Sequence, residues 1–145
     1  MLVVITLLHG AGLDRIVMRY RRRAEAARKI NLHPSLAALV FAGPILLMLL
    51  LHLLEICIWG FALTKAGLVP GFRDSVYFAA NTYTTVGYGD VVLPAAWREL
   101  SPIIAISGLF TFAWTTSELF NIVGYQHDLV SELSSRRHHG TPITR

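Results

Sequence analysis

The chain has 145 residues, a length typical of one domain, and 54% of them are hydrophobic while 15% are charged. Because soluble domains carry roughly 25% charged residues, we expect much of this surface to face lipid, in keeping with the mean hydropathy of +0.52. The net charge of +4 does not indicate a nucleic-acid partner, because seven of the thirteen Lys and Arg lie between Arg15 and Lys29, beside apolar segments. A single cysteine, Cys57, offers no disulfide framework.

The N-terminal region, residues 1–30, combines an apolar segment with a basic one. Residues 1–13 are apolar but would reach only about 20 Å as a helix, short of a ~30 Å hydrocarbon core. They form either a partial additional helix that continues through Ile16 and Val17 or a segment in the membrane interface. A basic segment, residues 15–29, follows and belongs in the cytoplasm by the positive-inside rule. It either contacts anionic lipid or acts only as a topology signal.

Residues 31–125 contain two membrane-length apolar stretches, of which the first predicts an outer helix over about 35–64. Pro44 is expected to kink it mildly. His52, Glu55 and Trp59 share one face of this helix. A carboxylate inside a membrane is costly unless it is paired, so His52 and Glu55 form either a proton-sensitive latch or a structural hydrogen bond. Two ligands are too few for a zinc site.

A short helix is expected over about 74–84, after an exposed loop and with Asp74 or Ser75 as its cap. Its length of about 16 Å is half a membrane, so we expect a re-entrant pore helix. Tyr77, Phe78 and Tyr83 are candidates for an aromatic cuff around the segment that follows.

That segment is Thr84-Thr85-Val86-Gly87-Tyr88-Gly89-Asp90. Glycine visits left-handed backbone angles at little steric cost, and Gly87 and Gly89 are spaced as an alternation of such angles requires. The alternation would turn successive carbonyls to one side. Four copies around an axis would then present rings of oxygens in place of the water around a cation.

The second apolar stretch predicts an inner helix over about 101–125, opened by Ser101 and Pro102. It carries Gly108 near its middle and a second intramembrane acid, Glu118. The tail, residues 126–145, is polar and is expected to be a short cytoplasmic helix that frays.

Residues 84–90 and the two flanking apolar stretches resemble the selectivity filter and pore module of bacterial two-helix potassium channels. The resemblance covers about residues 35–125. It implies an all-α membrane protein that assembles as a homotetramer, with K⁺ as permeant ion and no organic cofactor. By the same resemblance, the filter comprises residues 85–89, with K⁺ at the carbonyls of Thr85, Val86, Gly87 and Tyr88, and the additional N-terminal helix is favoured over the interfacial segment.

The resemblance also assigns roles around the filter. Thr84, Asp90, Tyr77 and Phe78 are expected to support it. Asn81 stands where many relatives carry an acid that pairs with the Asp after the filter, so Asp90 needs another partner. Two further candidates for gating lie on the inner helix. Gly108 is either a hinge or a site of close helix packing. Glu118 either contributes to a ring of four carboxylates near the inner mouth or bonds a neighbouring helix.

The charges set the expected topology, because a pore module with one re-entrant segment has both ends on one side. The basic segment falls on the same side as Arg136 and Arg137, while Lys65, Arg73 and Arg98 fall on the other. We therefore expect a multi-pass protein of the cell (plasma or inner) membrane, with the N-terminal basic loop and the C-terminal tail in the cytoplasm.

Two alternatives to a potassium-selective channel remain at this point. One is a weakly selective cation channel, which the intact sequence Val-Gly-Tyr-Gly at 86–89 disfavours. The other is a non-conducting membrane adaptor that keeps the pore fold. An enzyme is not expected, because no nucleophile and base occur at a workable spacing.

Overall fold

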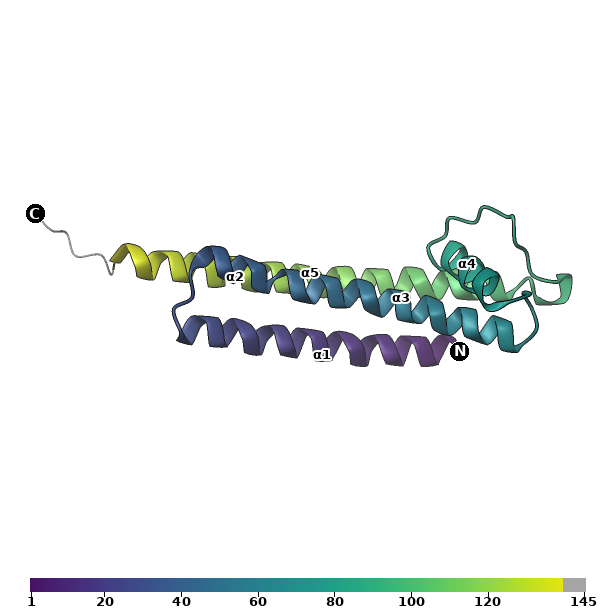
Figure 1. Ribbon diagram of the computed structural model, residues 1–145, viewed down its shortest axis with the longest axis horizontal. Coiled ribbons are helices and arrows are strands. Elements are labelled where there is room, and N and C mark those ends of the chain that lie inside the picture. Colours follow the sequence, from purple (N-terminus) through teal and green to yellow (C-terminus); the bar gives the residue numbers. More distant parts are fainter. Residues whose placement is uncertain (140–145) are drawn as a thin grey trace, which may run out of the picture. The chain divides into compact units, whose positions relative to one another are not determined.

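The computed structural model describes residues 1–139, and all regular elements in that range are helical (Figure 1). The prediction of an all-helical chain is therefore confirmed. Contacts divide the chain into two compact units. Unit 1 comprises Met1–Gly12 with Leu49–Thr115, and unit 2 comprises Leu13–Met48 with the described residues from Thr116 onward. The elements are, in order, α1 (Leu2–Lys29), α2 (Pro34–Val40), α3 (Ala42–Lys65), α4 (Phe72–Tyr83), the short 3₁₀ helix η1 (Ala95–Trp97) and α5 (Leu100–His139).

The predicted N-terminal helix forms and extends well beyond the apolar segment. α1 continues without interruption through Asp14 and the basic segment to Lys29. Two stretches of the described residues are long and apolar enough to cross a membrane, Ser35–Lys65 and Ala95–Arg136. The sequence of α1 is more polar on average than either of these.

The predicted outer helix is divided in two by a break at Phe41. α2 ends at Val40 and α3 begins at Ala42. Pro44 explains the break, because a proline has no N–H to donate to the carbonyl four residues earlier and its ring clashes with that carbonyl, here the carbonyl of Val40. The expected mild kink thus corresponds to a break of one residue within the span Ser35–Lys65.

The pore helix and the inner helix both differ from their predicted bounds. α4 begins two residues early, and its N-cap is Gly71 at φ 78°, with no side-chain cap. The expected capping by Asp74 or Ser75 is therefore wrong. The Ser75 hydroxyl instead donates to the Gly71 carbonyl at 2.9 Å. α5 continues past the predicted end near Tyr125, so the described part of the expected tail is a continuation of this helix. Residues 140–145 of that tail lie outside the described residues.

Unit 1 packs the short helix α4 against α3 and α5 (Figure 1). Trp59, Leu63, Phe78, Tyr83 and Ile104 are central members of its apolar core. The side chains on the other faces of α3 and α5 are exposed although they are large and apolar, as expected for surfaces that meet lipid or other subunits. They include Leu50, Leu53, Leu54, Phe61, Ile106, Leu109 and Phe110.

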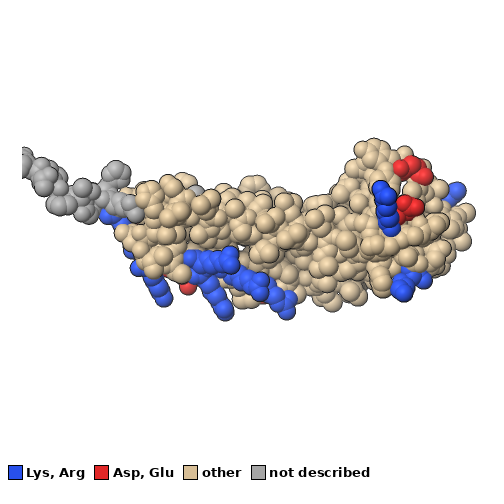
Figure 2. Space-filling model, in the orientation of Figure 1, with Lys and Arg blue, Asp and Glu red and all other residues tan. Residues whose placement is uncertain are grey.

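Unit 2 is held together by polar contacts as well as apolar ones. The Tyr20 hydroxyl donates to Gln126 Oε1 at 2.8 Å, and Gln126 Nε2 donates to the Ala37 carbonyl at 3.0 Å. Burial raises the pKa of Tyr20 to about 12, so this hydroxyl keeps its proton at physiological pH. Arg28 lies 3.3 Å from the carboxylate of Glu132. Figure 2 shows a row of Lys and Arg side chains over the part of α1 that belongs to this unit.

Candidate functional site

The segment after α4 has the backbone alternation that its glycines predicted. φ is positive at Thr85 (62°), Gly87 (59°) and Gly89 (79°), and these are alternate residues. A left-handed φ is normal for glycine but costly for a β-branched residue such as Thr85. The segment is therefore held in a strained conformation at Thr85. Alternating left-handed residues turn successive carbonyls to the same side of a strand.

This segment begins directly at the C-terminal end of α4. The Thr84 hydroxyl donates to the Ala80 carbonyl at 2.7 Å, and the Thr84 N–H donates to the same carbonyl at 3.0 Å. The Gly87 N–H donates to the Asn81 carbonyl at 3.2 Å. The carbonyls that end a helix carry partial negative charge, so this end of α4 favours a cation nearby.

Two side chains of the segment are largely exposed in the single chain. Val86 is 52% exposed and Tyr88 is 74% exposed. A hollow of about 380 Å³ is lined by the segment, by α4 and by the start of α5. An added Cβ at Gly87 would meet nothing within 4 Å. Backbone conformation, not crowding, is thus what requires glycine there.

Asp90 is hydrogen-bonded to Tyr77, a partner that the sequence did not identify. The Tyr77 hydroxyl donates to Asp90 Oδ2 at 2.8 Å, and the Val91 N–H donates to Asp90 Oδ1 at 3.0 Å. This hydrogen bond to a carboxylate raises the pKa of the Tyr77 hydroxyl above its ordinary value. Asn81 donates to the Tyr77 carbonyl at 3.1 Å and so braces the same turn of α4. Phe78 lies in the core of unit 1.

The expected aromatic cuff does not form as one set within the chain. Tyr77 bonds Asp90, whereas Tyr83 is fully buried on another side of α4 and bonds Glu55 Oε2 at 2.5 Å. Thr111 on α5 also lies 2.6 Å from the Tyr83 hydroxyl. Tyr83 therefore ties the end of the pore helix to α3 and α5.

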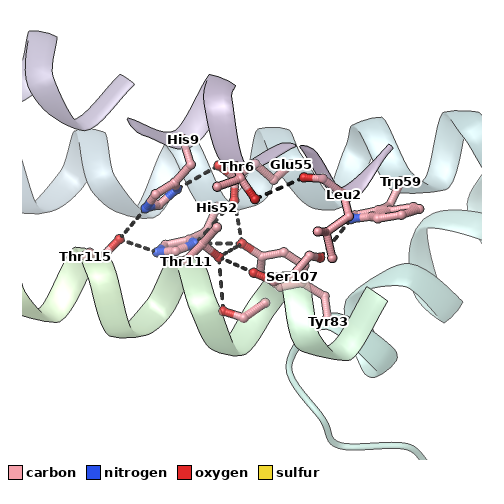
Figure 3. A network of polar contacts seen from close by, with 11 residues as sticks. Leu2, Thr6, His9, His52, Glu55, Trp59, Tyr83, Ser107, Thr111 and Thr115 are labelled. Carbon is pink, nitrogen blue, oxygen red and sulfur yellow. Dashed lines mark hydrogen bonds and ion pairs between the residues drawn. The ribbon is translucent and has the colours of Figure 1, made fainter. Parts of the chain in front are cut away.

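His52 and Glu55 are both buried. His52 Nδ1 lies 3.7 Å from Glu55 Oε2, which is within ion-pair distance but too long for a hydrogen bond. His52 Nδ1 instead lies 3.0 Å from the Tyr83 hydroxyl, which donates to Glu55 (Figure 3). The third member of the face, Trp59, donates from Nε1 to the Ser107 hydroxyl at 3.1 Å.

Two further residues complete this network, and the sequence placed neither of them beside His52 and Glu55. His9 on α1 is fully buried, and its Nδ1 lies 2.8 Å from Glu55 Oε1. Thr115 Oγ1 on α5 lies 3.1 Å from His9 Nε2 and 3.0 Å from His52 Nε2 (Figure 3). The only signal for His9 was a histidine within an apolar run, and its partner is 46 residues away.

Three side chains of this network are of types that could ligate a metal. The candidate ligand atoms of His9, His52 and Glu55 lie within 4.8 Å of one another. The sequence argument that there are only two such groups is therefore wrong. However, all ring nitrogens and both carboxylate oxygens already lie at hydrogen-bond distance from protein atoms. We therefore assign no metal to the cluster.

Gly108 and Glu118, the two candidates for gating on α5, have different surroundings. A Cβ at Gly108 would lie 2.0 Å from the Tyr83 carbonyl oxygen, so close packing of α5 against the end of α4 explains this glycine. Glu118 is partly exposed, and Asn121 Nδ2 lies 3.4 Å from its carboxylate. Within the described residues, Glu118 thus has a weak contact along its own helix.

Comparison with known proteins supports the sequence resemblance. A family model described as ion channel matches residues 40–124, which is more than half of the chain. The match includes α3, α4, residues 84–90 (the filter segment) and the first part of α5. No match was found among curated proteins or among solved structures. With its two membrane-length apolar helices, the chain is a membrane protein. It belongs to this ion channel family.

Proposed function

We propose that the protein is a potassium-selective channel that passes K⁺ passively down its electrochemical gradient. The observation that carries this proposal is the backbone of the filter segment, where left-handed angles alternate at Thr85, Gly87 and Gly89 within an intact Thr-Val-Gly-Tyr-Gly sequence. Such an alternation turns consecutive carbonyls to the same side, so that they can face one central axis. The family match supports transport over catalysis.

In the proposed mechanism, carbonyl oxygens replace the hydration shell of the ion. The carbonyls of Thr85, Val86, Gly87 and Tyr88 hold K⁺, and the Thr85 hydroxyl closes the innermost site. An ion enters because the oxygens compensate for its lost water, and it leaves because neighbouring ions repel it. One chain supplies a quarter of each ring of oxygens, so the working form is a homotetramer. The exposure of Val86 and Tyr88 in the single chain is in keeping with neighbours on that side.

The membrane arrangement follows from the charges. We place the basic row of α1 and the C-terminal part of α5 in the cytoplasm, and the filter end of unit 1 toward the outside. The basic row over α1 supports a contact with anionic lipid headgroups (Figure 2). Each basic side chain near a charged leaflet contributes about 1 kcal/mol to such a contact.

The test is ion flux into liposomes that contain the purified protein, with Gly87→Ala and Gly124→Ala as variants. Alanine is strained at the φ of +59° that Gly87 adopts, whereas Gly124 is helical and a Cβ there meets nothing within 4 Å. We expect K⁺ flux well above Na⁺ flux in the wild type and in Gly124→Ala, and loss of that flux in Gly87→Ala. Equal Na⁺ and K⁺ flux would instead indicate a weakly selective cation channel.

The assembly is tested separately by the mass of the purified protein in mild detergent. We expect four chains per particle. A stable monomer without flux would contradict the proposal and favour a membrane adaptor that keeps the pore fold.

A further inference from the structure

Five side chains of unit 1 form a closed ring of hydrogen bonds (Figure 3). Going around it, Glu55 Oε1 meets His9 Nδ1 at 2.8 Å, His9 Nε2 meets Thr115 Oγ1 at 3.1 Å, and Thr115 Oγ1 meets His52 Nε2 at 3.0 Å. His52 Nδ1 then meets the Tyr83 hydroxyl at 3.0 Å, which returns to Glu55 Oε2 at 2.5 Å. The ring joins α1, α3, α4 and α5.

The number of protons that this ring needs can be counted. It has five links, and each hydrogen bond requires one proton. With an ionised Glu55 and two neutral imidazoles, the available protons are one each from His9, Thr115, His52 and Tyr83. That state has four protons for five links, so one link is broken whichever tautomers are chosen. In particular, Thr115 has one hydroxyl proton but faces the Nε2 atoms of two histidines.

One additional proton completes the ring. It can be carried as a histidinium beside the Glu55 carboxylate or as a neutral Glu55 carboxyl beside two neutral imidazoles. In both forms the ring holds five protons and has no net charge. A sixth proton would place two hydrogens across one link. The ring is therefore complete only with five protons. With four or with six protons, at least one of its links is broken.

Water or another side chain cannot easily repair a broken link between the buried members of the ring, which are four of the five; Thr115 is partly exposed. His9, Glu55 and Tyr83 have no exposed surface and His52 is 5% exposed. A buried polar group without a partner destabilises the fold. The titratable groups that meet here are His9 from α1, His52 and Glu55 from α3, and Tyr83 from α4.

Around the ring, α5 contributes only hydroxyls and aromatic rings. The Phe112 ring lies 4.4 Å from the His52 ring and the Trp114 ring 5.9 Å from the His9 ring, measured between centroids. The Thr111 hydroxyl, which meets Tyr83 and the carbonyls of its own helix, lies on none of the five links.

We propose that this ring is a proton-dependent clamp on the pore helix, closed at one proton content and loosened by loss or gain of a proton. Tyr83 is the last residue of α4, directly before residues 84–90 and two residues before the positive-φ Thr85. When the broken link is one of the two at the Tyr83 hydroxyl, this side chain loses a bond to His52 or Glu55 on α3, and the support beneath the filter is weakened. His9 is accordingly a positioning residue that acts on the filter through Glu55 and Tyr83.

The proton content can be measured without ion conduction. We would label histidine with ¹⁵N and glutamate with ¹³C, in protein in lipid at pH 7, and replace the four histidines outside the ring by glutamine. The expected result is five protons: one charged imidazole beside an ionised Glu55, or two neutral imidazoles beside a protonated Glu55. Two neutral imidazoles beside an ionised carboxylate, or two charged imidazoles, would overturn the proposal.

A Glu55→Gln variant sharpens the test because its amide supplies one N–H and one acceptor to the ring. The ring then holds five protons with both imidazoles neutral and no acid left to ionise. We expect no charged imidazole in this variant at pH 7. A charged His9 or His52 in the variant would contradict the count of protons. Signals that Glu55→Gln removes from the ¹³C spectrum identify the carboxyl of Glu55 in the wild type.

The consequence for transport rests on the proposed function and is tested by the pH dependence of K⁺ flux. We expect wild-type flux to fall on both the alkaline and the acid side of an optimum. Glu55→Gln should keep its flux on the alkaline side, while His127→Gln, which changes an exposed histidine outside the ring, should match the wild type. An alkaline fall that is identical in Glu55→Gln and wild type would overturn the clamp. Absence of flux at every pH would count against the proposed function and leave the proton count intact.

Discussion

Replacing Gly108 by alanine tests how closely the end of α4 packs against α5. The added Cβ would lie 2.0 Å from the Tyr83 carbonyl oxygen and 2.9 Å from its carbon. Real Cβ atoms essentially never lie within 3.0 Å of such a neighbour, so the end of α4 must move by about 1 Å. The obstacle is backbone, which cannot rotate away as a side chain can.

The expected cost follows from two opposing effects. Overpacking of this kind costs typically 1–3 kcal/mol, and we take the upper end because backbone must move. Alanine also gains about 1 kcal/mol over glycine within a helix. The net loss in the free energy of unfolding is therefore about 2 kcal/mol for Gly108→Ala.

The matched control is Gly124→Ala on the same helix, where a Cβ meets nothing within 4 Å. This variant should keep or slightly raise stability. The assay is unfolding of both variants in detergent, followed by circular dichroism, together with K⁺ flux. Gly108→Ala should unfold more easily and conduct less, because Tyr83 lies next to the filter segment. Wild-type stability in Gly108→Ala with altered opening would refute close packing and restore the hinge interpretation.

Three further substitutions test other contacts. Tyr77→Phe removes the donor to Asp90 and should slightly lower the unfolding midpoint. Because the pKa of the Tyr77 hydroxyl is raised in the folded state, its hydrogen bond to Asp90 stabilises the fold fully below about pH 10. This stabilisation is lost as the pH rises through the raised pKa. The difference in stability between variant and wild type should therefore vanish at strongly alkaline pH. Gly60→Ala would place a Cβ 2.8 Å from the Val76 Cα and should destabilise unit 1 by roughly 1–3 kcal/mol, seen as a lower unfolding midpoint. Glu118→Gln should lower single-channel K⁺ current more at low than at high salt, if its carboxylates attract cations near the pore.

The local features of residues 84–90 and of the helices were accessible from the sequence because short-range chemistry decides them. The conformation of residues 84–90 depends on the glycines within one heptapeptide, and the backbone adopts positive φ at both Gly87 and Gly89 as predicted. The helices follow from apolar length, and the break at Phe41 follows from Pro44 once its clash with the carbonyl of Val40 is considered.

The contacts between helices were not accessible because they depend on helix rotation. Sequence places His52 and Glu55 on one face, but not which partners face them. His9 and Thr115 reach the same point from helices far away in the chain. Likewise, Tyr83 was a candidate for the aromatic cuff, and its hydroxyl donates to Glu55 on α3.

The capping of α4 and the partner of Asp90 were missed for a different reason. Several polar side chains near each site could have satisfied the same backbone or carboxylate group. The N-cap position of α4 is occupied by Gly71, which has a positive φ and makes no side-chain hydrogen bond, so a search for side-chain caps overlooks it. Tyr77 reaches Asp90 because a turn of helix and the whole filter segment bring them together across thirteen residues.

The most direct test of potassium selectivity is the reversal potential in a planar bilayer with K⁺ on one side and Na⁺ on the other. The proposed filter predicts a potential far from zero, of the sign that K⁺ movement sets, which disappears together with the current in Gly87→Ala. A clear current that reverses at zero would contradict the claim that these carbonyls select K⁺.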